Sequence, residues 1–358
     1  MLLGRFGVNR LSFYKGKKVF ITGHTGFKGA WLCRILLQTG AEVTGYALEP
    51  PTEPSLFVQA KIASNIRSII SDIRNRNTLI KAVQDAKPDI VFHLAAQPLV
   101  RLSYREPAAT YETNVMGTVN ILEALRLTPG IRSLVNITTD KVYENKEWFW
   151  GYRENENLCG YDPYSNSKSC SELVTHSYRN AFFHYEDAPA VSTARSGNVI
   201  GGGDYAEDRI IPDCIRAVQA GKEIVLRNPY SIRPYQHVLE CLSGYLLLAE
   251  QQYQDKSLEG SYNFGPDDVS CVTTGELAAL FCDVWGQGAS WVEQHDNGPH
   301  EANFLKLDCS KAKTVLGWRQ SWDIKTAIEK VVVFAWADTD SARLACVNGQ
   351  IQNYFGEE

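Results

Sequence analysis

The sequence lacks the cysteine and histidine spacings that build metal sites and redox motifs. Its nine cysteines are odd in number and scattered, and no two of them form a CxxC motif. Its seven histidines include no HxxxH or HExxH pair. Zinc therefore has no support in the sequence, and no metal site is predicted. Scattered, unpaired thiols are typical of a chain that works in a reducing compartment.

Long apolar runs and a basic surplus are also missing. The longest late apolar run, 331–337 (VVVFAWA), is far shorter than the roughly 20 residues that span a bilayer. The basic residues near the start of the chain are not followed by the apolar segment of a signal peptide. A formal net charge of -5 offers no general attraction for nucleic acid or for an anionic membrane. We therefore expect a cytoplasmic protein that binds neither.

The sequence does contain an alternation of short apolar runs with longer segments of helical period, from about residue 17 to residue 194. Runs such as DIVFHLAA suit strands that are covered on both faces. The alternation predicts an α/β fold with a Rossmann-type, doubly wound parallel sheet, followed by a smaller C-terminal α/β substrate domain. We expect the dinucleotide-binding domain over 1–205, with 231–260 returning to it, and the substrate domain over 206–230 and 261–358.

A glycine-rich turn, GHTGFKG, follows the first predicted strand and opens a helical segment. Gly23 allows a tight turn, Gly26 lets the backbone approach a pyrophosphate, and Gly29 lets helix and strand pack closely. This setting predicts a bound dinucleotide. His24 either covers the phosphate or fills the turn, and Lys28 either meets the cofactor or reaches the surface. The cofactor contacts predicted here are Gly23, His24, Thr25, Gly26, Phe27, Lys28 and Gly29.

The second predicted strand ends without the acidic residue that usually accepts the ribose hydroxyls. Ala47 stands there, which weakens the preference for NAD over NADP, yet no arginine stands ready to bind a 2′-phosphate. Glu49 is a possible substitute for the acid. Further along the chain, Asp72 and Ile73 are expected to contact the adenine. The nicotinamide ribose is expected to rest on Leu94, Ala95 and Ala96.

A set of reactive side chains gathers around the end of the fifth predicted strand. Tyr164 and Lys168 lie one helical turn apart, so both project from one helix face. Lys168 and an oxidised nicotinamide are expected to lower the phenol pKa from about 10 toward neutrality. Thr139, Asp140 and Lys141 stand at the carboxyl end of the strand, which is the ligand edge of a parallel sheet. This position favours catalysis over a surface ion pair.

Seven motifs together resemble the extended short-chain dehydrogenase/reductase family. They are GHTGFKG, HLAAQPLVR, TNVMGT, TTDKVYEN, DPYSNSK, ARSGNVIGGGDYAEDRIIPD and RPYQHVLE, and the resemblance runs from about Lys15 to Trp336. Within this family they are most similar to the nucleotide-sugar 4,6-dehydratases. The TDK of 139–141, where dTDP-type enzymes carry TDE, points to CDP-glucose as the substrate. The cofactor that the resemblance implies is NAD.

The resemblance also implies a role for each reactive residue. Tyr164, aided by Thr139 and Lys168, would take the proton of the sugar 4-OH while C4 is oxidised. Lys141 would remove the C5 proton, and Asp140 would protonate the departing 6-OH. A neutral Lys141 needs a pKa about three units below that of free lysine, so a charged Lys141 that stabilises the C5 enolate is an open alternative.

Substrate contacts and an oligomer are implied in the same way. The substrate contacts are Gln97, Asn198, Arg209, Arg233 and His300, and arginine suits the bidentate pairing of a diphosphate. The helices expected over 111–127 and 164–183 resemble the pair that forms a helix-bundle homodimer in this family. By sequence alone they could equally be plain sheet-covering helices.

Two other functions are compatible with parts of this pattern. A nucleotide-sugar 4-epimerase would share Tyr164, Lys168 and NAD, but it needs neither a C6 acid nor a C5 base, so Asp140 and Lys141 argue against it. A catalytically silent dinucleotide-binding interaction protein would keep the fold without the chemistry. The joint presence of Thr139, Tyr164 and Lys168 counts against that alternative.

Overall fold

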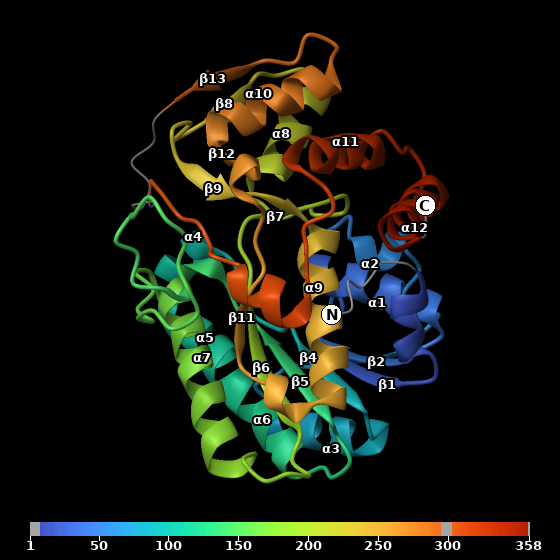
Figure 1. The fold of residues 1–358 in the computed structure, drawn as a ribbon. Coiled ribbons are helices and arrows are strands. Elements are labelled where there is room, and N and C mark those ends of the chain that lie inside the picture. The colour runs from blue at the N-terminus through green and yellow to red at the C-terminus, as the bar shows by residue number, and fades with distance from the viewer. Residues whose placement is uncertain (1–7, 295–302, 357–358) are drawn as a thin grey trace.

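A seven-stranded parallel sheet forms the centre of the computed structural model, which describes residues 8–294 and 303–356. The strand order is β11-β6-β5-β4-β1-β2-β3 (Figure 1). This arrangement confirms the predicted Rossmann-type fold. The strands are β1 (Lys18–Thr22), β2 (Glu42–Ala47), β3 (Arg67–Ile70), β4 (Ile90–His93), β5 (Ser133–Ile137), β6 (Ala190–Arg195) and β11 (Ser261–Asn263).

The point where the strand order reverses lies between β1 and β4. From β1 the chain builds outward through β2 and β3, and it then returns to place β4 on the other side of β1, with Thr22 paired to His93. All four residues of β4 and all five of β5 are buried, as expected for strands that helices cover on both faces. A crevice outside the carboxyl ends of β1 and β4 is therefore where a ligand should bind.

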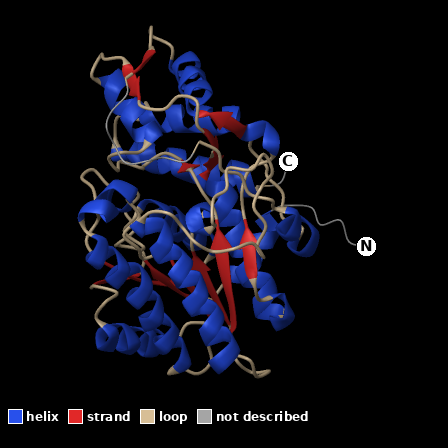
Figure 2. Cartoon of the chain, turned by 90° about the vertical axis from the view of Figure 1, so that its left-hand side faces the viewer, coloured by secondary structure: helices blue, strands red, loops and turns tan. Residues whose placement is uncertain are grey.

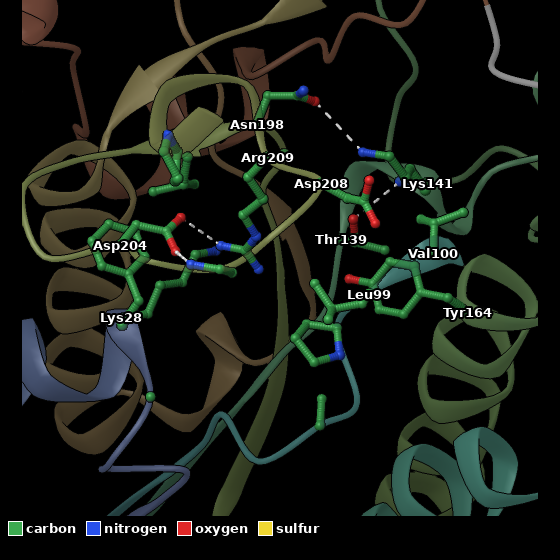
Figure 3. Close-up of a pocket in the computed structure, with 18 of the residues that line it drawn as sticks. Lys28, Leu99, Val100, Thr139, Lys141, Tyr164, Asn198, Asp204, Asp208 and Arg209 are labelled. Carbon is green, nitrogen blue, oxygen red and sulfur yellow. Dashed lines mark hydrogen bonds and ion pairs between the residues drawn. The ribbon is translucent and has the colours of Figure 1, made fainter. Parts of the chain in front are cut away.

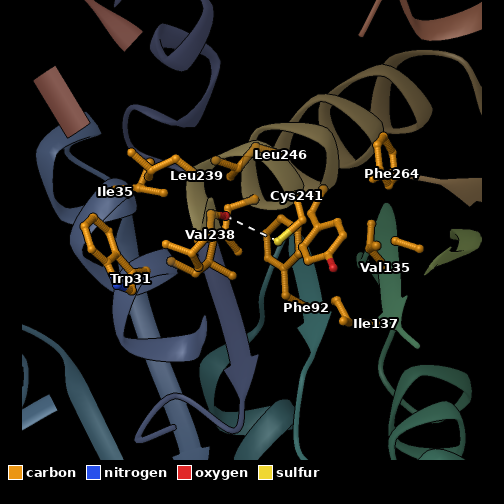
Figure 4. Close-up of a cluster of buried hydrophobic side chains, with 14 of the residues drawn as sticks. Trp31, Ile35, Phe92, Val135, Ile137, Val238, Leu239, Cys241, Leu246 and Phe264 are labelled. Atoms are coloured by element: carbon orange, nitrogen blue, oxygen red, sulfur yellow. Dashed lines mark hydrogen bonds between the residues drawn. The ribbon is translucent and has the colours of Figure 1, made fainter. Parts of the chain in front are cut away.

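Helices cover the two faces of this sheet and bury separate apolar clusters. On one face, α1 and α9 join Trp31, Ile35 and Val238 to the strand residues Phe92 and Val135 (Figure 4). On the other face, a second cluster lies beneath the packed helices α3, α6 and α7. These helices are α1 (Phe27–Thr39), α9 (Val238–Gln254), α3 (Arg76–Ala86), α6 (Gly117–Arg126) and α7 (Pro163–Phe182).

A smaller lobe lies beyond the carboxyl edge of the sheet (Figures 1 and 2). It contains a parallel pair, β8 with β13, and an antiparallel pair, β9 with β12. A third apolar cluster, which includes Ile211, Phe281 and Ile328, forms its own core. Its elements are α8 (Ile210–Gln219), β8 (Ile224–Leu226), β9 (Ile232–Pro234), β12 (Cys271–Thr273), α10 (Thr274–Trp285), β13 (Trp291–Glu293) and α11 (Ile324–Ala335).

Short elements and a final helix complete the fold. None of the described helices is long and apolar enough to cross a membrane. The remaining elements are η1 (Val8–Tyr14), α2 (Leu56–Gln59), α4 (Val100–Arg105), α5 (Pro107–Tyr111), η2 (Glu112–Met116), η3 (Asp140–Val142), β7 (Val199–Ile200), β10 (Gln236–His237), η4 (Lys256–Leu258), η5 (Asp268–Ser270), η6 (Ala312–Leu316) and α12 (Asp340–Phe355).

The structure corrects the expected domain boundaries at three places. β9 lies within 231–260 but pairs with β12 of the smaller lobe, so the return to the sheet begins after it. β11 lies beyond 260 but pairs with β6 and closes one edge of the central sheet. α12 packs against α1 and α2, and so the end of the chain also returns to the dinucleotide-binding part. Strand pairing joins residues far apart along the chain, which a linear pattern does not reveal.

A buried carboxyl group joins α9 to the smaller lobe and to α12. Glu240 is fully buried and accepts hydrogen bonds from the backbone N–H groups of Ser321 and Trp322. The hydroxyl of Tyr354, from α12, donates to the same carboxyl at 2.8 Å. Burial raises the pKa of Glu240 to about 7, although these hydrogen bonds act in the opposite direction. The group therefore titrates near neutrality.

We expect the stability of the protein to fall as pH rises through about 7 on account of Glu240. The folded chain holds this proton to a higher pH than the unfolded chain, where a glutamate has a pKa of about 4.3. The stabilisation is complete below the unfolded pKa and is lost above the folded one. Glu240→Gln should flatten the decrease in Tm between about pH 4.3 and 7, as measured by calorimetry.

The matched control is Glu329→Gln, which removes an exposed carboxylate that lies 3.8 Å from Lys325. An exposed pair of this kind contributes little to stability, so this variant should keep the wild-type pH profile. Identical pH profiles for Glu240→Gln and wild type would contradict the assignment.

Candidate active site

A cavity of about 1820 Å³ lies between the carboxyl edge of the central sheet and the smaller lobe. The glycine turn and the ends of β4 and β5 form its wall on the sheet side. Segments around β7, α8 and β8 form the opposite wall. The cavity therefore occupies the crevice that the reversal of strand order creates.

The glycine turn brings backbone, rather than side chains, against the cavity. Gly23 has φ +78°, and a Cβ atom there would lie 2.7 Å from the backbone nitrogen of Ala95. A Cβ atom at Gly29 would lie 2.1 Å from the carbonyl oxygen of Gly23. Gly26 precedes α1 without a side-chain cap, so the first N–H groups of the helix are available to an anion. Thr25, Phe27 and Lys28 also line this end of the cavity.

Two predicted contact residues have side chains outside the described cavity lining. The ring of His24 is buried behind the turn, where Nε2 lies 2.7 Å from Ser68 Oγ. Burial lowers the pKa of His24 to about 4, so this neutral ring fills the turn and offers a phosphate no charge. The Gln97 amide donates to Thr110 Oγ1 and to the carbonyl of Leu99. Both side chains are used for local structure instead.

Lys28 points into the protein toward the cavity, which excludes the surface alternative. Its ammonium donates to Ser196 Oγ at 3.1 Å and to the hydroxyl of Tyr245 at 3.4 Å. Burial lowers its pKa, and the nearby charge of Arg209 acts in the same direction. A buried ammonium whose partners are hydroxyls is well placed to meet an anionic ligand group.

The expected adenine end of the cavity contains an arginine that the sequence analysis missed. Asp72, Ile73 and Ala47 line the cavity as expected, and Arg74 lies beside them. Arg74 Nη2 lies 2.6 Å from Asp72 Oδ2, and hydrogen bonds from Arg74 lower the pKa of Asp72. The signal was present in the sequence, since Arg74 stands two positions after Asp72 and an arginine so close can fold back onto the carboxylate.

The reactive residues meet at the end of β5. Thr139, Lys141 and Tyr164 all line the cavity, and Figure 3 shows them on one wall with Asn198 opposite Lys141. Lys141 Nζ lies 3.2 Å from Asp140 Oδ1 and 3.5 Å from Asn198 Oδ1. Two local structures place these side chains. The short helix η3 turns the chain soon after β5, and α7 begins at Pro163 with Asp162 as its N-cap.

Burial has the largest effect on the phenol of Tyr164 in the protein alone. Burial raises its pKa to about 12, and a hydrogen bond with Thr139 only partly offsets this rise. Lys168 donates to the carbonyl oxygen of Ile137 at 3.1 Å, and burial followed by the charge of Lys28 lowers the Lys168 pKa to about 8. The protein alone therefore does not lower the phenol pKa. The expected decrease toward neutrality also depends on the charge of a bound oxidised nicotinamide, and it stays a prediction.

Asp140 lies behind the cavity wall and does not form part of its described lining. Its carboxyl group is fully buried and accepts from Thr139 Oγ1 at 2.9 Å and from Lys141 Nζ. Its second oxygen, Oδ2, packs against Gly197 and has no hydrogen-bond partner within the described part of the chain. As placed, Asp140 orients Thr139 and Lys141 and makes no direct approach to a ligand. Its expected role as the acid that protonates the departing 6-OH stays a prediction.

A buried ion pair supports the whole reactive segment. Glu172, two turns after Tyr164 on α7, lies 2.8 Å from Arg195 at the end of β6. Glu172 also accepts hydrogen bonds from Thr138 and Thr193. Burial by itself raises the pKa of Glu172. The charge of Arg195 and these hydrogen bonds lower it by more, so the pKa of Glu172 lies below its ordinary value. No spacing rule in the sequence indicates this pair.

The opposite wall brings most of the predicted substrate contacts together. Asn198, Arg209 and Arg233 line the cavity. Arg209 is held by Asp204 at 2.8 Å. His300 lies outside the described residues. Among the described residues, no group of three or more His, Cys, Asp or Glu side chains could hold a metal ion.

The fold and this site define a class of protein. A Rossmann sheet, a glycine turn against the cavity, and a Thr139, Tyr164 and Lys168 set at the end of β5 describe a dinucleotide-dependent short-chain dehydrogenase/reductase. More particularly, the chain belongs to the GDP-mannose 4,6 dehydratase family, whose model matches residues 20–331. This membership confirms the resemblance drawn from the motifs.

Similar proteins share the reaction type as well as the fold. CDP-glucose 4,6-dehydratase of Salmonella typhimurium is 49% identical over 96% of this chain and 98% of its own length. dTDP-glucose 4,6-dehydratase of Streptomyces antibioticus is 29% identical over 88% of this chain and 91% of its own length.

Solved structures agree on the fold. UDP-glucuronic acid 4-epimerase from Bacillus cereus, in complex with UDP-glucuronic acid and NAD, has a TM-score of 0.77 at 22% identity and covers 88% of this chain and 98% of its own. dTDP-glucose 4,6-dehydratase from Streptomyces venezuelae, with NAD and TYD bound, has a TM-score of 0.75 at 22% identity and covers 88% of this chain and 95% of its own.

Gly197→Ala should disable the reactive segment without unfolding the protein. A Cβ atom there would lie 1.8 Å from Asp140 Oδ2, so the carboxyl group must rotate and lose its contacts with Thr139 and Lys141. A displacement of about 1 Å at reacting groups can reduce turnover about 100-fold. We expect a loss of that size in kcat, measured alongside the Tm.

Gly349→Ala is the matched control. Gly349 lies within α12, and a Cβ atom there would meet nothing within 4 Å. This variant should keep full activity and gain about 0.5–1 kcal/mol of stability from the better helix former. Equal activity of both variants would show that Asp140 has no influence on turnover.

Proposed function

We propose that this protein catalyses the NAD-dependent 4,6-dehydration of CDP-glucose to CDP-4-keto-6-deoxyglucose, with loss of water. The observation that carries the proposal is that Thr139, Lys141 and Tyr164 lie together on one wall of a cavity at the carboxyl edge of a Rossmann sheet. The 49% identity to a CDP-glucose 4,6-dehydratase over nearly the full length of both chains supports the choice of substrate.

The residues present fit NAD. Gly23 and Gly29 leave no room for a Cβ atom, so the backbone of the turn can lie directly against a pyrophosphate at the start of α1. Leu94, Ala95 and Ala96 line the next part of the cavity, where they would hold the nicotinamide ribose. When bound, NAD supplies a hydride acceptor and then a hydride donor. Arg74 forms an ion pair with Asp72 at this end of the cavity.

Tyr164 takes the proton from the 4-OH of the glucose unit. Because burial raises the pKa of this phenol to about 12, it holds its own proton firmly until a positive charge comes close. Thr139 is hydrogen-bonded to Tyr164 and orients it. Lys168, with a pKa lowered to about 8, can change its protonation state near physiological pH and so exchange the proton onward.

Lys141 acts at C5 of the 4-keto sugar, whose ketone makes that hydrogen acidic. The ammonium or amine of Lys141 faces the cavity between Asp140 and Asn198. It serves either as the base or as a fixed positive charge for the enolate. Asp140 orients Lys141 from behind the wall. Its delivery of a proton to the departing 6-OH requires the carboxyl group to move toward the cavity or to pass its proton through Thr139 or Lys141.

The proposal includes a homodimer in the cytoplasm. Apolar side chains on η2 and α7 are exposed in the single chain, among them Met116 at 50%, Leu173 at 54% and Phe182 at 44%. A helix bundle between two copies would cover these side chains. The nucleotide sugar is the expected small-molecule partner.

Lys141→Gln should separate the two halves of the reaction. Oxidation at C4 should survive, because Tyr164, Thr139 and Lys168 are unchanged. Exchange of the C5 hydrogen with solvent deuterium should decrease about 10²–10⁴-fold, since the group that acts at C5 is lost. The measurement is mass spectrometry of the sugar after incubation in D2O, and full turnover by this variant would exclude both roles of Lys141.

A parallel incubation with CDP-glucose, dTDP-glucose and UDP-glucose, with and without added NAD, tests the function itself. We expect turnover of CDP-glucose, and a chromophore that develops in alkali, which is typical of 4-keto-6-deoxy sugars. A 4-epimerase would convert substrate without that chromophore, and a silent binding protein would leave every nucleotide sugar unchanged.

A further inference from the structure

A chain of three charged side chains joins two walls of the cavity. Asp208 Oδ1 lies 3.2 Å from Arg227 Nη1 and 3.7 Å from Arg101 Nε. Arg101 belongs to α4, on the dinucleotide-binding side, whereas Arg227 follows β8 in the smaller lobe. All three residues line the cavity. One carboxylate therefore joins arginines from opposite walls.

The segment that supplies this carboxylate pairs with a further cavity arginine. Asp204 lies four positions before Asp208 and holds Arg209 at 2.8 Å. Asp204 is buried, with a side chain 5% exposed, and is a fixed partner, whereas the side chain of Asp208 is 43% exposed. The two carboxylates of one short segment thus pair with three arginines of the cavity wall, and Asp208 is the more exposed of the two.

The backbone at Asp208 is held in an unusual conformation. Its φ is +58°, in the left-handed region that costs free energy for residues other than glycine. In this conformation the side chain reaches Arg101 on one wall and Arg227 on the other.

We propose that Asp208 is an internal stand-in for the diphosphate of the substrate. Its carboxylate holds Arg101 and Arg227 in place while the cavity is free, and the phosphates of a nucleoside diphosphate sugar displace it and take over both arginines. This inference rests on the proposed function, because that function supplies the dianionic ligand. It adds Arg101 and Arg227 to the residues that recognise the substrate, and it makes Asp208 a competitor whose charge opposes binding.

The physical basis is an exchange of ion pairs. Arginine pairs with phosphate through bidentate, charge-assisted hydrogen bonds at least as well as with a carboxylate. The displaced Asp208 is half-exposed and can be hydrated, so its release costs little. Two arginines that are already held near their final positions lose less conformational freedom when the ligand arrives.

Asp208→Asn in the full-length protein with NAD tests the inference by calorimetric titration with CDP. The substitution keeps the shape of the side chain but removes its charge, so we expect CDP to bind about five- to tenfold more tightly, with little change for uncharged cytidine. Arg227→Gln and Arg101→Gln should each weaken CDP binding about tenfold. In the Arg227→Gln background, the gain from Asp208→Asn should shrink.

The matched control is Asp268→Asn, which makes the same change in net charge at an exposed carboxylate that lies 3.4 Å from Lys306, outside the cavity lining. It should leave CDP binding unchanged. Unchanged or weaker CDP binding by Asp208→Asn, in a variant with wild-type Tm, would overturn the inference. If the wild-type protein still turns over CDP-glucose, that result refutes only the role of Asp208 as a stand-in. If the wild-type protein turns over no nucleotide sugar, the proposed function itself is refuted.

Discussion

The buried ion pair between Glu172 and Arg195 is the interaction on which the site depends. Both side chains are 2% exposed, and the pair joins α7 to the end of β6. Glu172 also accepts a hydrogen bond from the hydroxyl of Thr138, and Arg195 donates one to the hydroxyl of Tyr143. These two hydrogen bonds fix the chain on both sides of the segment 139–141. Removal of one partner from such a pair typically costs about 3–5 kcal/mol, because an uncompensated charge remains buried. The ion pair therefore restricts the movement of the reactive segment between its two anchor points.

Charge is distributed around the cavity according to burial. Burial lowers the pKa of Lys28 and of Lys168, so both ammonium groups lose their protons more readily than a lysine in water. The arginines of the opposite wall remain charged, and carboxylates of the 204–208 segment hold two of them, Arg209 and Arg227. The dinucleotide end thus combines backbone N–H groups with adjustable ammonium groups, whereas the substrate end offers permanent positive charges.

The agreement between sequence and structure is good where the signal is local. The parallel sheet follows from apolar runs and their spacing, and the turn at Gly23, Gly26 and Gly29 follows from steric needs that act within a few residues. Tyr164 and Lys168 share a helix face because of the helical repeat. The errors are non-local. The ring of His24 turns to Ser68, and the carboxyl group of Asp140 packs behind Gly197.

The sequence by itself determined the class of fold, the position of the dinucleotide turn, the reactive set at the end of the fifth strand, and the family. These features depend on residue type and spacing within short segments, and both can be read before the chain has folded. Only the tertiary structure decided which side chains reach the cavity, that Glu172 meets Arg195, and that Asp208 joins Arg101 to Arg227. Burial and charge contacts of this kind arise between segments far apart in the sequence, and their free energies depend on distances that exist only after the chain has packed.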